Sequence, residues 1–425
     1  MIQRPRGTRD LLPPETRLWQ AVEAVARQVF GSFGGEEIRT PAFESTELFV
    51  RSVGETTDIV HKEMYTFPDR KGRSLTLRPE GTAGVARAWI ENGLGDRSHP
   101  LRLYYLGPMF RYERMQRGRY RQFSQIGLEI VGADTPLVDA ELLAAMHEFF
   151  VRLSFDDLVI HLNNLGDPED RARYQDVIRA ALTPHRSELC SDCQRRLDEN
   201  PLRILDCKVP SCQALAADVP TMDAVAGEAS RQHVARVEEH LKALDIPYVR
   251  DPRLVRGLDY YLRTVFEVVS PKLGAGTVLC GGGRYDRLIA DLGGPAIPGV
   301  GFAIGEDRLV EVLPAAFRDA VLNRPRLYVV PLGEAAERRV LEVAMAWARE
   351  GVSLEVEVSG RSLKAALKRA DREGFAAVAM LGEDELRDGT VSVRDLADGA
   401  QSSLALPGLA GWWRERHGTL APAER

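Results

Sequence analysis

The chain has 425 residues, of which 44% are apolar and 28% are charged, and its formal net charge is −6. This length exceeds one ordinary hydrophobic core, so two or three domains are expected. No apolar run approaches the roughly 18 residues that a membrane helix needs, and the first residues lack the apolar segment of a signal peptide. These features predict a cytoplasmic protein without a membrane segment.

Helices and strands are mixed in the first half of the chain. Residues 16–34 have helical apolar spacing and end at a glycine, which predicts a helix capped by Thr16. Strand-like residues follow up to Pro41. The run RSLTLRPEGT predicts a short strand and a turn, and residues 81–92 predict a helix. Two β-rich runs, LRLYYLGPMFRYE and RQFSQIGLEIVG, then predict a hairpin with a long polar loop.

The order of the later elements predicts the domain organisation. Sequence between Pro168 and about Leu244 is charged and helical, and strand signals stand before and after it. This order favours an α+β fold with a largely antiparallel sheet that a helical insertion interrupts. After Pro325, strands and helices alternate as in a small α/β domain. The predicted domains are residues 1–166 with 246–322, the insertion at 167–245, and 325–425.

The stretch FRYERMQRGRYRQF holds five arginines between Arg111 and Arg121 against one acid, Glu113. A charge run is often only a solvated surface, and this alternative is open from the composition alone. Aromatic residues alternate with these arginines, however, and guanidinium groups bind phosphate with two hydrogen bonds and stack on rings. The stretch therefore favours binding of a nucleotide or a nucleic-acid backbone.

A cysteine cluster lies within the helical insertion. Cys190, Cys193, Cys207 and Cys212 have the spacing C-x2-C-x13-C-x4-C. Two close pairs at this separation are typical of a structural zinc site, although the second spacing is wide. Unligated thiols in a helical domain are the alternative.

Several enzyme signatures are absent. The run LCGGGRYDRLI places Gly281 to Gly283 before a predicted helix, but the dinucleotide-binding fingerprint is incomplete. The sequence also lacks a P-loop, HExxH and GxSxG, which disfavours Walker-type hydrolases, zinc proteases and α/β-hydrolases. In the last domain a predicted helix carries basic residues on one side, which suits either a solvated face or contact with phosphates: Arg361, Lys364, Lys368 and Arg372.

Taken in order, the motifs RGTRDLLP, LRPEGTAG, FRYE with GRYRQFSQIGLE, RGLDYY, GGGRYD and GVGFAIGEDRL resemble the signatures of the histidyl-tRNA synthetases, class II aminoacyl-tRNA synthetases. The resemblance covers nearly the whole chain, and RGLDYY is its most specific part. It implies a ligase that activates L-histidine with ATP and Mg²⁺ to histidyl-adenylate and pyrophosphate. The histidyl group then passes to the 3′ end of tRNA(His). A homodimer and a C-terminal anticodon-binding domain are also implied.

The resemblance implies roles for individual residues in binding ATP. Arg111 and Arg256 would hold the α-phosphate from two sides as the catalytic pair, and Arg308 would hold the γ-phosphate. The remaining nucleotide contacts would be Glu113 and Phe123 at adenine and Arg121.

It also implies contacts to the other two substrates. Glu80, Thr82 and Gln125 would bind the α-amino group of histidine, and Glu129 with Tyr261 would bind the imidazole nitrogens. The histidine pocket would be completed by Gly81, Tyr260 and Tyr285. Arg114, Gln116 and Arg117 would meet the acceptor end of tRNA, and the basic helix of the last domain would contact the anticodon arm.

Two other functions are compatible with part of these features. A catalytically silent paralogue, the regulatory subunit of ATP phosphoribosyltransferase, shares the catalytic fold, but it generally lacks the C-terminal domain and an intact RGLDYY, and both are present here. A plain RNA-binding module would explain the basic stretches. It leaves the constellation of Glu80, Gln125, Glu129 and Tyr261 without a purpose.

Overall fold

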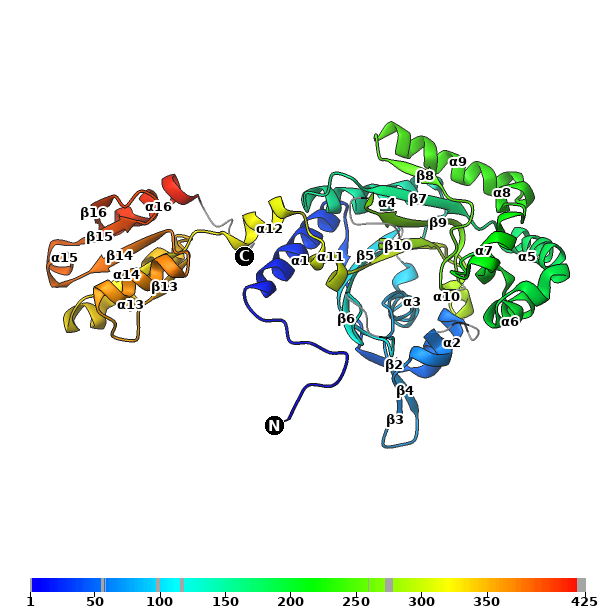
Figure 1. Ribbon diagram of the computed structural model, residues 1–425, viewed down its shortest axis with the longest axis horizontal. Helices are drawn as coiled ribbons and strands as arrows, with labels where there is room; N and C mark the ends of the chain where they lie inside the picture. The colour runs from blue at the N-terminus through cyan, green and yellow to red at the C-terminus, as the bar shows by residue number, and fades with distance from the viewer. Residues whose placement is uncertain are drawn as a thin grey trace. The chain divides into compact units, whose positions relative to one another are not determined.

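The computed structural model describes residues 2–54, 57, 59–96, 100–114, 118–258, 260–271 and 278–418. The chain forms two compact units, Met1–Arg318 and Asp319–Arg425 (Figure 1). The division falls within helix α12 (Ala315–Leu322). None of the helices in these ranges is long and apolar enough to cross a lipid bilayer.

An eight-stranded sheet forms the centre of the first unit, in the order β1-β5-β6-β11-β10-β9-β7-β8. The outermost pair at each edge is parallel, and the neighbouring pairs between them are antiparallel. The strands are β1 (Glu36–Glu37), β5 (Leu101–Phe110), β6 (Gln122–Val131), β7 (Val159–Asn164), β8 (Tyr248–Arg250), β9 (Leu262–Val269), β10 (Val278–Arg284) and β11 (Gly299–Gly305). The predicted α+β fold with a largely antiparallel sheet is confirmed, as is the β5–β6 hairpin.

Helices α1 (Glu15–Ser32) and α4 (Pro136–Arg152) pack together on one face of this sheet (Figure 1). The Phe30 ring of α1 lies 5.7 Å from the ring of Phe302 on β11 and 5.6 Å from that of Phe149 on α4. The predicted cap of α1 is wrong. The helix begins at Glu15 behind Pro14, because proline already has the φ angle that a helix start requires.

Helix α3 (Thr82–Glu91) packs against the apolar cluster that the other face of the sheet carries. Trp89 of α3 joins this cluster with Leu103 and Tyr105, which alternate along β5. Around α3 lie α2 (Thr46–Val53), η1 (Ile59–Glu63), η2 (Leu94–Asp96), α10 (Leu288–Asp291) and a small sheet in the order β2-β4-β3, formed by β2 (Phe43–Ser45), β3 (Thr66–Pro68) and β4 (Ser74–Leu77).

The insertion between β7 and β8 is helical, as predicted, and is green in Figure 1. Its elements are α5 (Pro168–Leu182), η3 (Thr183–Glu188), α6 (Ser191–Glu199), η4 (Pro201–Ile204), α7 (Pro210–Ala217), α8 (Met222–Val225) and α9 (Glu228–Ala243). It has its own apolar core, which includes Tyr174, Leu197 and three of its four cysteines. The insertion is therefore packed around a core of its own, next to the sheet.

Gly281 to Gly283 lie within strand β10, and the helix predicted after them is α10 (Leu288–Asp291). These glycines allow neighbouring groups to approach the strand. An ideal Cβ on Gly282 would stand 2.1 Å from the carbonyl oxygen of Gly301, and one on Gly283 would stand 2.6 Å from that of Thr264. The glycine run thus serves close packing within the sheet and at its surface.

The second unit is a small α/β domain, as predicted, with a sheet in the order β13-β12-β14-β15-β16. Strand β12 is parallel to β13 and β14, and β15 and β16 continue antiparallel. Its elements are β12 (Leu327–Pro331), α13 (Glu334–Arg349), β13 (Leu354–Val356), α14 (Leu363–Arg372), β14 (Ala377–Leu381), α15 (Glu383–Asp388), β15 (Thr390–Asp395), β16 (Gln401–Ala405), η6 (Leu406–Gly408) and α16 (Leu409–His417).

Candidate active site

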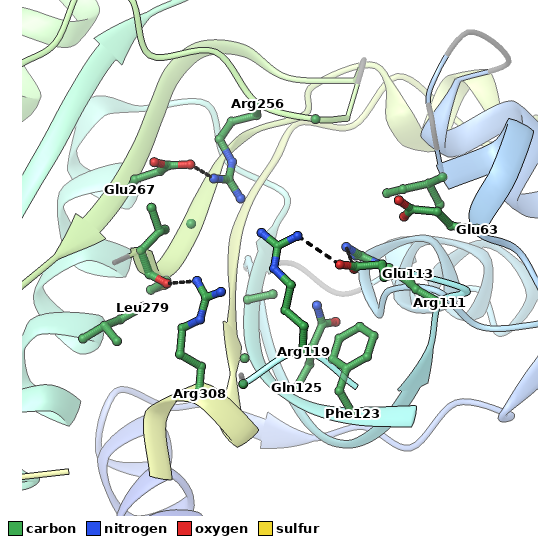
Figure 2. Close-up of a pocket in the computed structure, with 18 of the residues that line it drawn as sticks. Glu63, Arg111, Glu113, Arg119, Phe123, Gln125, Arg256, Glu267, Leu279 and Arg308 are labelled. Atoms are coloured by element: carbon green, nitrogen blue, oxygen red, sulfur yellow. Dashed lines mark hydrogen bonds and ion pairs between the residues drawn. The ribbon is translucent and has the colours of Figure 1, made fainter. Parts of the chain in front are cut away.

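A cavity of about 550 Å³ opens in the first unit where the β5–β6 connection meets β9, β10 and helix α11 (Glu306–Glu311) (Figure 2). Segments from four distant parts of the sequence line it. The polar and charged side chains among them are Glu63, Arg111, Glu113, Arg119, Tyr120, Gln125, Arg203, Asp206, Lys208, Arg256, Glu267 and Arg308. Cations outnumber carboxylates in this set, so the cavity suits an anionic ligand.

Three guanidinium groups from different elements point into this space: Arg256, Arg119 and Arg308 (Figure 2). Arg119 pairs with Glu113 at 3.1 Å, and Arg308 donates to the carbonyl oxygen of Val278 at 3.1 Å. Burial, and after it the positive charge of Arg119, lower the pKa of Arg308. The protein thus holds like charges together in a partly buried site, an arrangement that an anion between them would relieve.

Arg256 is held between a carboxylate and a glycine. Its guanidinium pairs with Glu267 of β9, and its Nε is buried without a hydrogen-bond partner among the described residues. An ideal Cβ on Gly281 would stand 2.4 Å from Cζ of Arg256. Any residue other than glycine at position 281 would therefore displace the guanidinium, and the unpaired Nε is a donor available to a ligand.

Arg111, Glu113 and Phe123 line the cavity together. The Nε of Arg111 donates to the carbonyl oxygen of Pro79 at 2.8 Å, and its Cζ lies 5.4 Å from the centre of the Phe123 ring. Glu113 is 3.8 Å from Arg111. Arg256 and Arg308 line the same cavity. The structure therefore brings together five of the six residues that the resemblance assigns to ATP.

Arg121 is the sixth, and it does not line the cavity. Its Cζ lies 3.7 Å over the ring of Tyr112, and its backbone N–H donates to the carbonyl oxygen of Gly7 at 2.7 Å. Arg119, which sequence reasoning missed, lines the cavity instead. Residues two apart on an extended chain share a face, so spacing could not distinguish them, and the contact with the N-terminal segment covers Arg121.

Glu129 is the centre of a buried hydrogen-bond cluster. Its carboxylate accepts bonds from the hydroxyls of Thr82 at 2.7 Å and Tyr285 at 2.6 Å, with the hydroxyl of Tyr105 at 3.5 Å. Burial raises the pKa of Glu129 to about 8, although the hydroxyl donors oppose this. An ideal Cβ on Gly301 of the neighbouring strand β11 would stand only 1.6 Å from Oε2. The carboxylate therefore occupies space that any side chain at position 301 would fill.

Gln125 connects this cluster to the cavity. It lies two strand repeats before Glu129 on β6, so both side chains belong to the same face of the sheet. Its Oε1 and the hydroxyl of Tyr260 are buried and have no hydrogen-bond partner in the described part of the chain. Buried polar atoms are normally paired, so these two atoms mark places for polar ligand groups.

The other residues assigned to histidine lie around the same cluster. The ring centre of Tyr260 is 4.6 Å from that of Tyr261 and 5.8 Å from that of Tyr285. The carboxylate of Glu80 accepts the backbone N–H groups of Thr82 and Ala83, at 2.6 and 2.8 Å. Glu80 thus caps the start of α3, a role that the sequence did not indicate. Gly81 is buried beside Tyr105, whose ring a Cβ there would overlap at 2.3 Å.

The residues assigned to tRNA are surface residues where the structure describes them. Arg114 is exposed, while Gln116 and Arg117 lie outside the described residues. In the second unit, Lys364, Lys368 and Arg372 are exposed on α14, and Leu363, Leu367 and the buried Ala370 pack inward. Arg361 precedes the helix and pairs with Glu357 at 2.9 Å.

The four cysteines of the insertion converge. Their Sγ atoms all lie within 4.8 Å of one another, and each cysteine is a free thiol. Cys190 precedes the first residue of α6, Cys193 lies in its first turn, and Cys212 lies in the first turn of α7. The fold therefore places four thiols from two helix starts and one connecting turn around one point.

Glu306, the first residue of α11, gives a prediction of pH dependence. It is 1% exposed, and burial, followed by Glu23 and Asp307, raises its pKa to about 9. The native state therefore keeps a proton that the unfolded state loses above about 4.5, so wild-type stability falls as pH rises between these values. Glu306→Gln removes this titration. The free energy of unfolding of the variant minus that of wild type should therefore be larger at pH 8 than at pH 6, by about 1–3 kcal/mol. Urea unfolding at both pH values tests it, and an equal difference would contradict it.

Comparisons with known proteins show the family to which the chain belongs. The family model "Histidyl-tRNA synthetase" matches residues 7–309, and "Anticodon binding domain" matches residues 326–416. A histidine–tRNA ligase of Desulfitobacterium hafniense is 46% identical over 406 residues, which are 95% of this chain and 96% of that protein. One of Bacillus cytotoxicus is 46% identical over 419 residues, covering 98% and 99%. The structure of apo S. aureus histidyl-tRNA synthetase covers 97% of this chain and 100% of its own, with 35% identity and a TM-score of 0.79. The chain belongs to the histidyl-tRNA synthetase family.

Proposed function

We propose that this protein ligates histidine to tRNA(His), with ATP as the energy source and histidyl-adenylate as the intermediate. The observation that carries the proposal is the adjacency of two sites. An arginine-lined cavity meets a buried carboxylate and tyrosine cluster at Gln125, which lines the cavity and shares a strand face with Glu129. The first site suits a triphosphate and the second an imidazole.

In the first step, a carboxylate oxygen of histidine attacks the α-phosphorus of ATP. A P–O bond forms to the carboxylate and the bond to pyrophosphate breaks, so negative charge moves to the leaving group. Arg111 and Arg256 act at the α-phosphate and Arg308 acts at the γ-phosphate, and Arg119 adds a fourth cation. Fixed cations at developing charge are the main source of catalysis in such a transfer.

Class II synthetases use Mg²⁺ together with ATP. Magnesium binds carboxylate and phosphate oxygens, and Glu63 and Glu113 offer carboxylates at the cavity wall. When bound, the ion would add positive charge at the phosphates. Phe123 offers a ring face for adenine, and Glu113 an acceptor for its amino group.

Recognition of histidine rests on the Glu129 cluster. Glu129 and Tyr261 would pair the two ring nitrogens of the imidazole, and Tyr260 and Tyr285 would enclose the ring. A pocket that hydrogen-bonds both nitrogens rejects analogues that leave its polar atoms unpaired. Gln125, whose Oε1 has no partner among the described residues, would hold the α-amino group together with Glu80 and Thr82 at the start of α3.

The second step requires tRNA. Arg114, Gln116 and Arg117 in the β5–β6 connection are the proposed contacts for the acceptor end, and Lys364, Lys368 and Arg372 on α14, with Arg361 before it, those for the anticodon arm. We also propose a homodimer. Phe43 and Phe67 are 52% and 40% exposed on the small sheet β2-β4-β3. Contact with a second copy of the chain would remove these apolar rings from water.

Histidine-dependent exchange of labelled pyrophosphate into ATP tests the proposed function. The expected result is exchange that requires histidine and that occurs without tRNA. A regulatory paralogue and an RNA-binding module both lack this activity. Absence of exchange in folded, histidine-binding protein would contradict the proposal.

For the cysteine cluster we propose a structural zinc ion bound by Cys190, Cys193, Cys207 and Cys212. Four thiolates that converge within 4.8 Å fit a closed tetrahedral site with no position left for chemistry. Elemental analysis of protein purified without chelator should give about one zinc per chain. A value well under one equivalent would exclude the site.

A further inference from the structure

Part of the cavity wall comes from the helical insertion. The segment from Asn200 to Lys208 follows the second cysteine, includes the third, Cys207, and contains η4. Arg203, Asp206 and Lys208 of this segment line the cavity beside Arg256. The insertion therefore contributes two cations to the proposed ATP site.

Arg203 contacts the backbone of Arg256. Its Nη1 donates to the carbonyl oxygen of Arg256 at 2.8 Å, and it lies next to Gly257, where an ideal Cβ would stand 3.8 Å from Nη1. Glycine at position 257 has a wide range of allowed backbone angles, so the chain directly after Arg256 is weakly restrained by its own covalent structure. The hydrogen bond from Arg203 restricts that freedom, so it orients Arg256 without touching its guanidinium.

Leu205 joins the segment to both domains. It packs against the core cluster of the sheet that contains Tyr260 and Tyr285, and also against the core cluster of the insertion that contains Cys193, Cys207 and Cys212. A displacement of the segment would therefore disturb packing on both sides. Its position depends on what fixes its ends.

Cysteines of the cluster lie before, within and after the segment. Cys193 lies on α6 before the segment, and Cys207 lies within it, adjacent to Lys208. The Sγ atoms of Cys190 and Cys207 are 3.9 Å apart, and tetrahedral zinc with Zn–S bonds of about 2.3 Å separates sulfur atoms by about 3.8 Å. Backbone N–H groups point at two sulfurs, that of Cys190 at Cys212 at 3.2 Å and that of Val209 at Cys207 at 3.5 Å. Such bonds orient and stabilise metal-bound thiolates.

We propose that the tetrathiolate metal site of the insertion positions Arg203, and through it Arg256, at the ATP cavity, so that metal occupancy controls the rate of histidine activation. The inference rests on the proposed function. Arg203 is a positioning residue, because it acts on the backbone of another residue. Without metal, the turn at Cys207 loses its attachment to α6 and α7, and the hydrogen bond to the carbonyl of Arg256 is no longer enforced.

The test compares two routes to the same defect. Cys207→Ser removes a ligand, whereas Arg203→Ala removes the contact and leaves the cluster intact. Arg203→Lys keeps a donor. Arg195→Ala is the matched control, since Arg195 is an arginine of the same insertion, on α6, whose ion pairs are with Asp192 and Glu199. For each full-length variant, zinc content, hydrogen exchange of residues 200–208, and kcat and KM in pyrophosphate exchange are measured.

The expected results separate the two routes. Cys207→Ser should contain no zinc, should exchange faster over residues 200–208, and should lose about tenfold or more in kcat with little change in the KM for histidine. Arg203→Ala should keep its zinc and show a similar loss of kcat. Arg203→Lys should recover part of it, and Arg195→Ala should match wild type.

Other outcomes overturn the inference or the function separately. Zinc-free, folded Cys207→Ser with wild-type kcat overturns the coupling and leaves the synthetase function standing. If Cys207→Ser does not fold, zinc-loaded Arg203→Ala with wild-type kcat overturns it. Wild-type protein that exchanges pyrophosphate but holds no zinc overturns the metal site. Zinc-loaded wild type without any exchange contradicts the proposed function instead.

Discussion

Replacing Arg256 by alanine is expected to lower kcat for pyrophosphate exchange by about 100- to 1,000-fold, the usual effect of removing a fixed donor from a developing charge. Its guanidinium is paired with Glu267 and held against Gly281, and its buried Nε has no hydrogen-bond partner in the part of the chain that the structure describes. Because this cation acts mainly when charge shifts to pyrophosphate, the KM for histidine should change little. Steady-state exchange kinetics at saturating ATP measure both constants.

Two further variants make this test specific. Gly281→Ala should reproduce much of the defect, because its Cβ would stand 2.4 Å from Cζ of Arg256 and displace the guanidinium. Arg102→Ala is the matched control. Arg102 is a partly buried arginine that forms two hydrogen bonds to Glu141, at 2.5 and 2.8 Å, outside the cavity. Near-normal exchange by Arg256→Ala would refute its assigned role.

The substitution Glu129→Gln is expected to raise the KM for histidine on the order of 100-fold, with a smaller effect on the KM for ATP. Burial raises the pKa of Glu129 to about 8 in the pocket without ligand, so the carboxylate is poorly solvated and gains from an N–H donor. A hydrogen bond from the imidazole N–H to the carboxylate is charge-assisted and worth about 1.5–3 kcal/mol, and neutral glutamine forms only a weaker one. Exchange measured over a range of histidine concentrations gives the constant.

Glu306→Gln is the matched control for Glu129→Gln. Both replace a buried glutamate whose pKa burial raises well above its usual value, but Glu306 does not line the cavity. Its variant should keep the wild-type KM for histidine. A histidine KM for Glu129→Gln within a few-fold of wild type would exclude this carboxylate as an imidazole ligand.

Local patterns predicted many elements of this fold. Helical apolar spacing predicted α1, and alternation predicted the β5–β6 hairpin, because these periods follow from backbone geometry alone. The change to alternating strands and helices after Pro325 predicted the second unit. The predicted cap of α1 was wrong, and the local sequence did not place the glycine run inside a strand. Both features depend on how neighbouring segments pack, which the local sequence does not contain.

Motif order also predicted which residues would gather in the first unit. Arg111, Glu113, Phe123, Arg256 and Arg308 line one cavity although up to 197 positions separate them. The choice between Arg119 and Arg121 did not follow from the motif, since both lie on one extended stretch. The backbone bond from Arg121 to Gly7 joins segments that are far apart in sequence.

The sequence by itself determined the family, the elements and the composition of the site, because short motifs and periodic patterns record chemistry and backbone geometry directly. Only the tertiary structure decided which groups face one another. It put the glycines of β10 and β11 against Arg256 and Glu129, and it brought Arg203 from the insertion to the carbonyl of Arg256. These contacts join residues that are distant in the chain, and they arise from the packing of strands and domains.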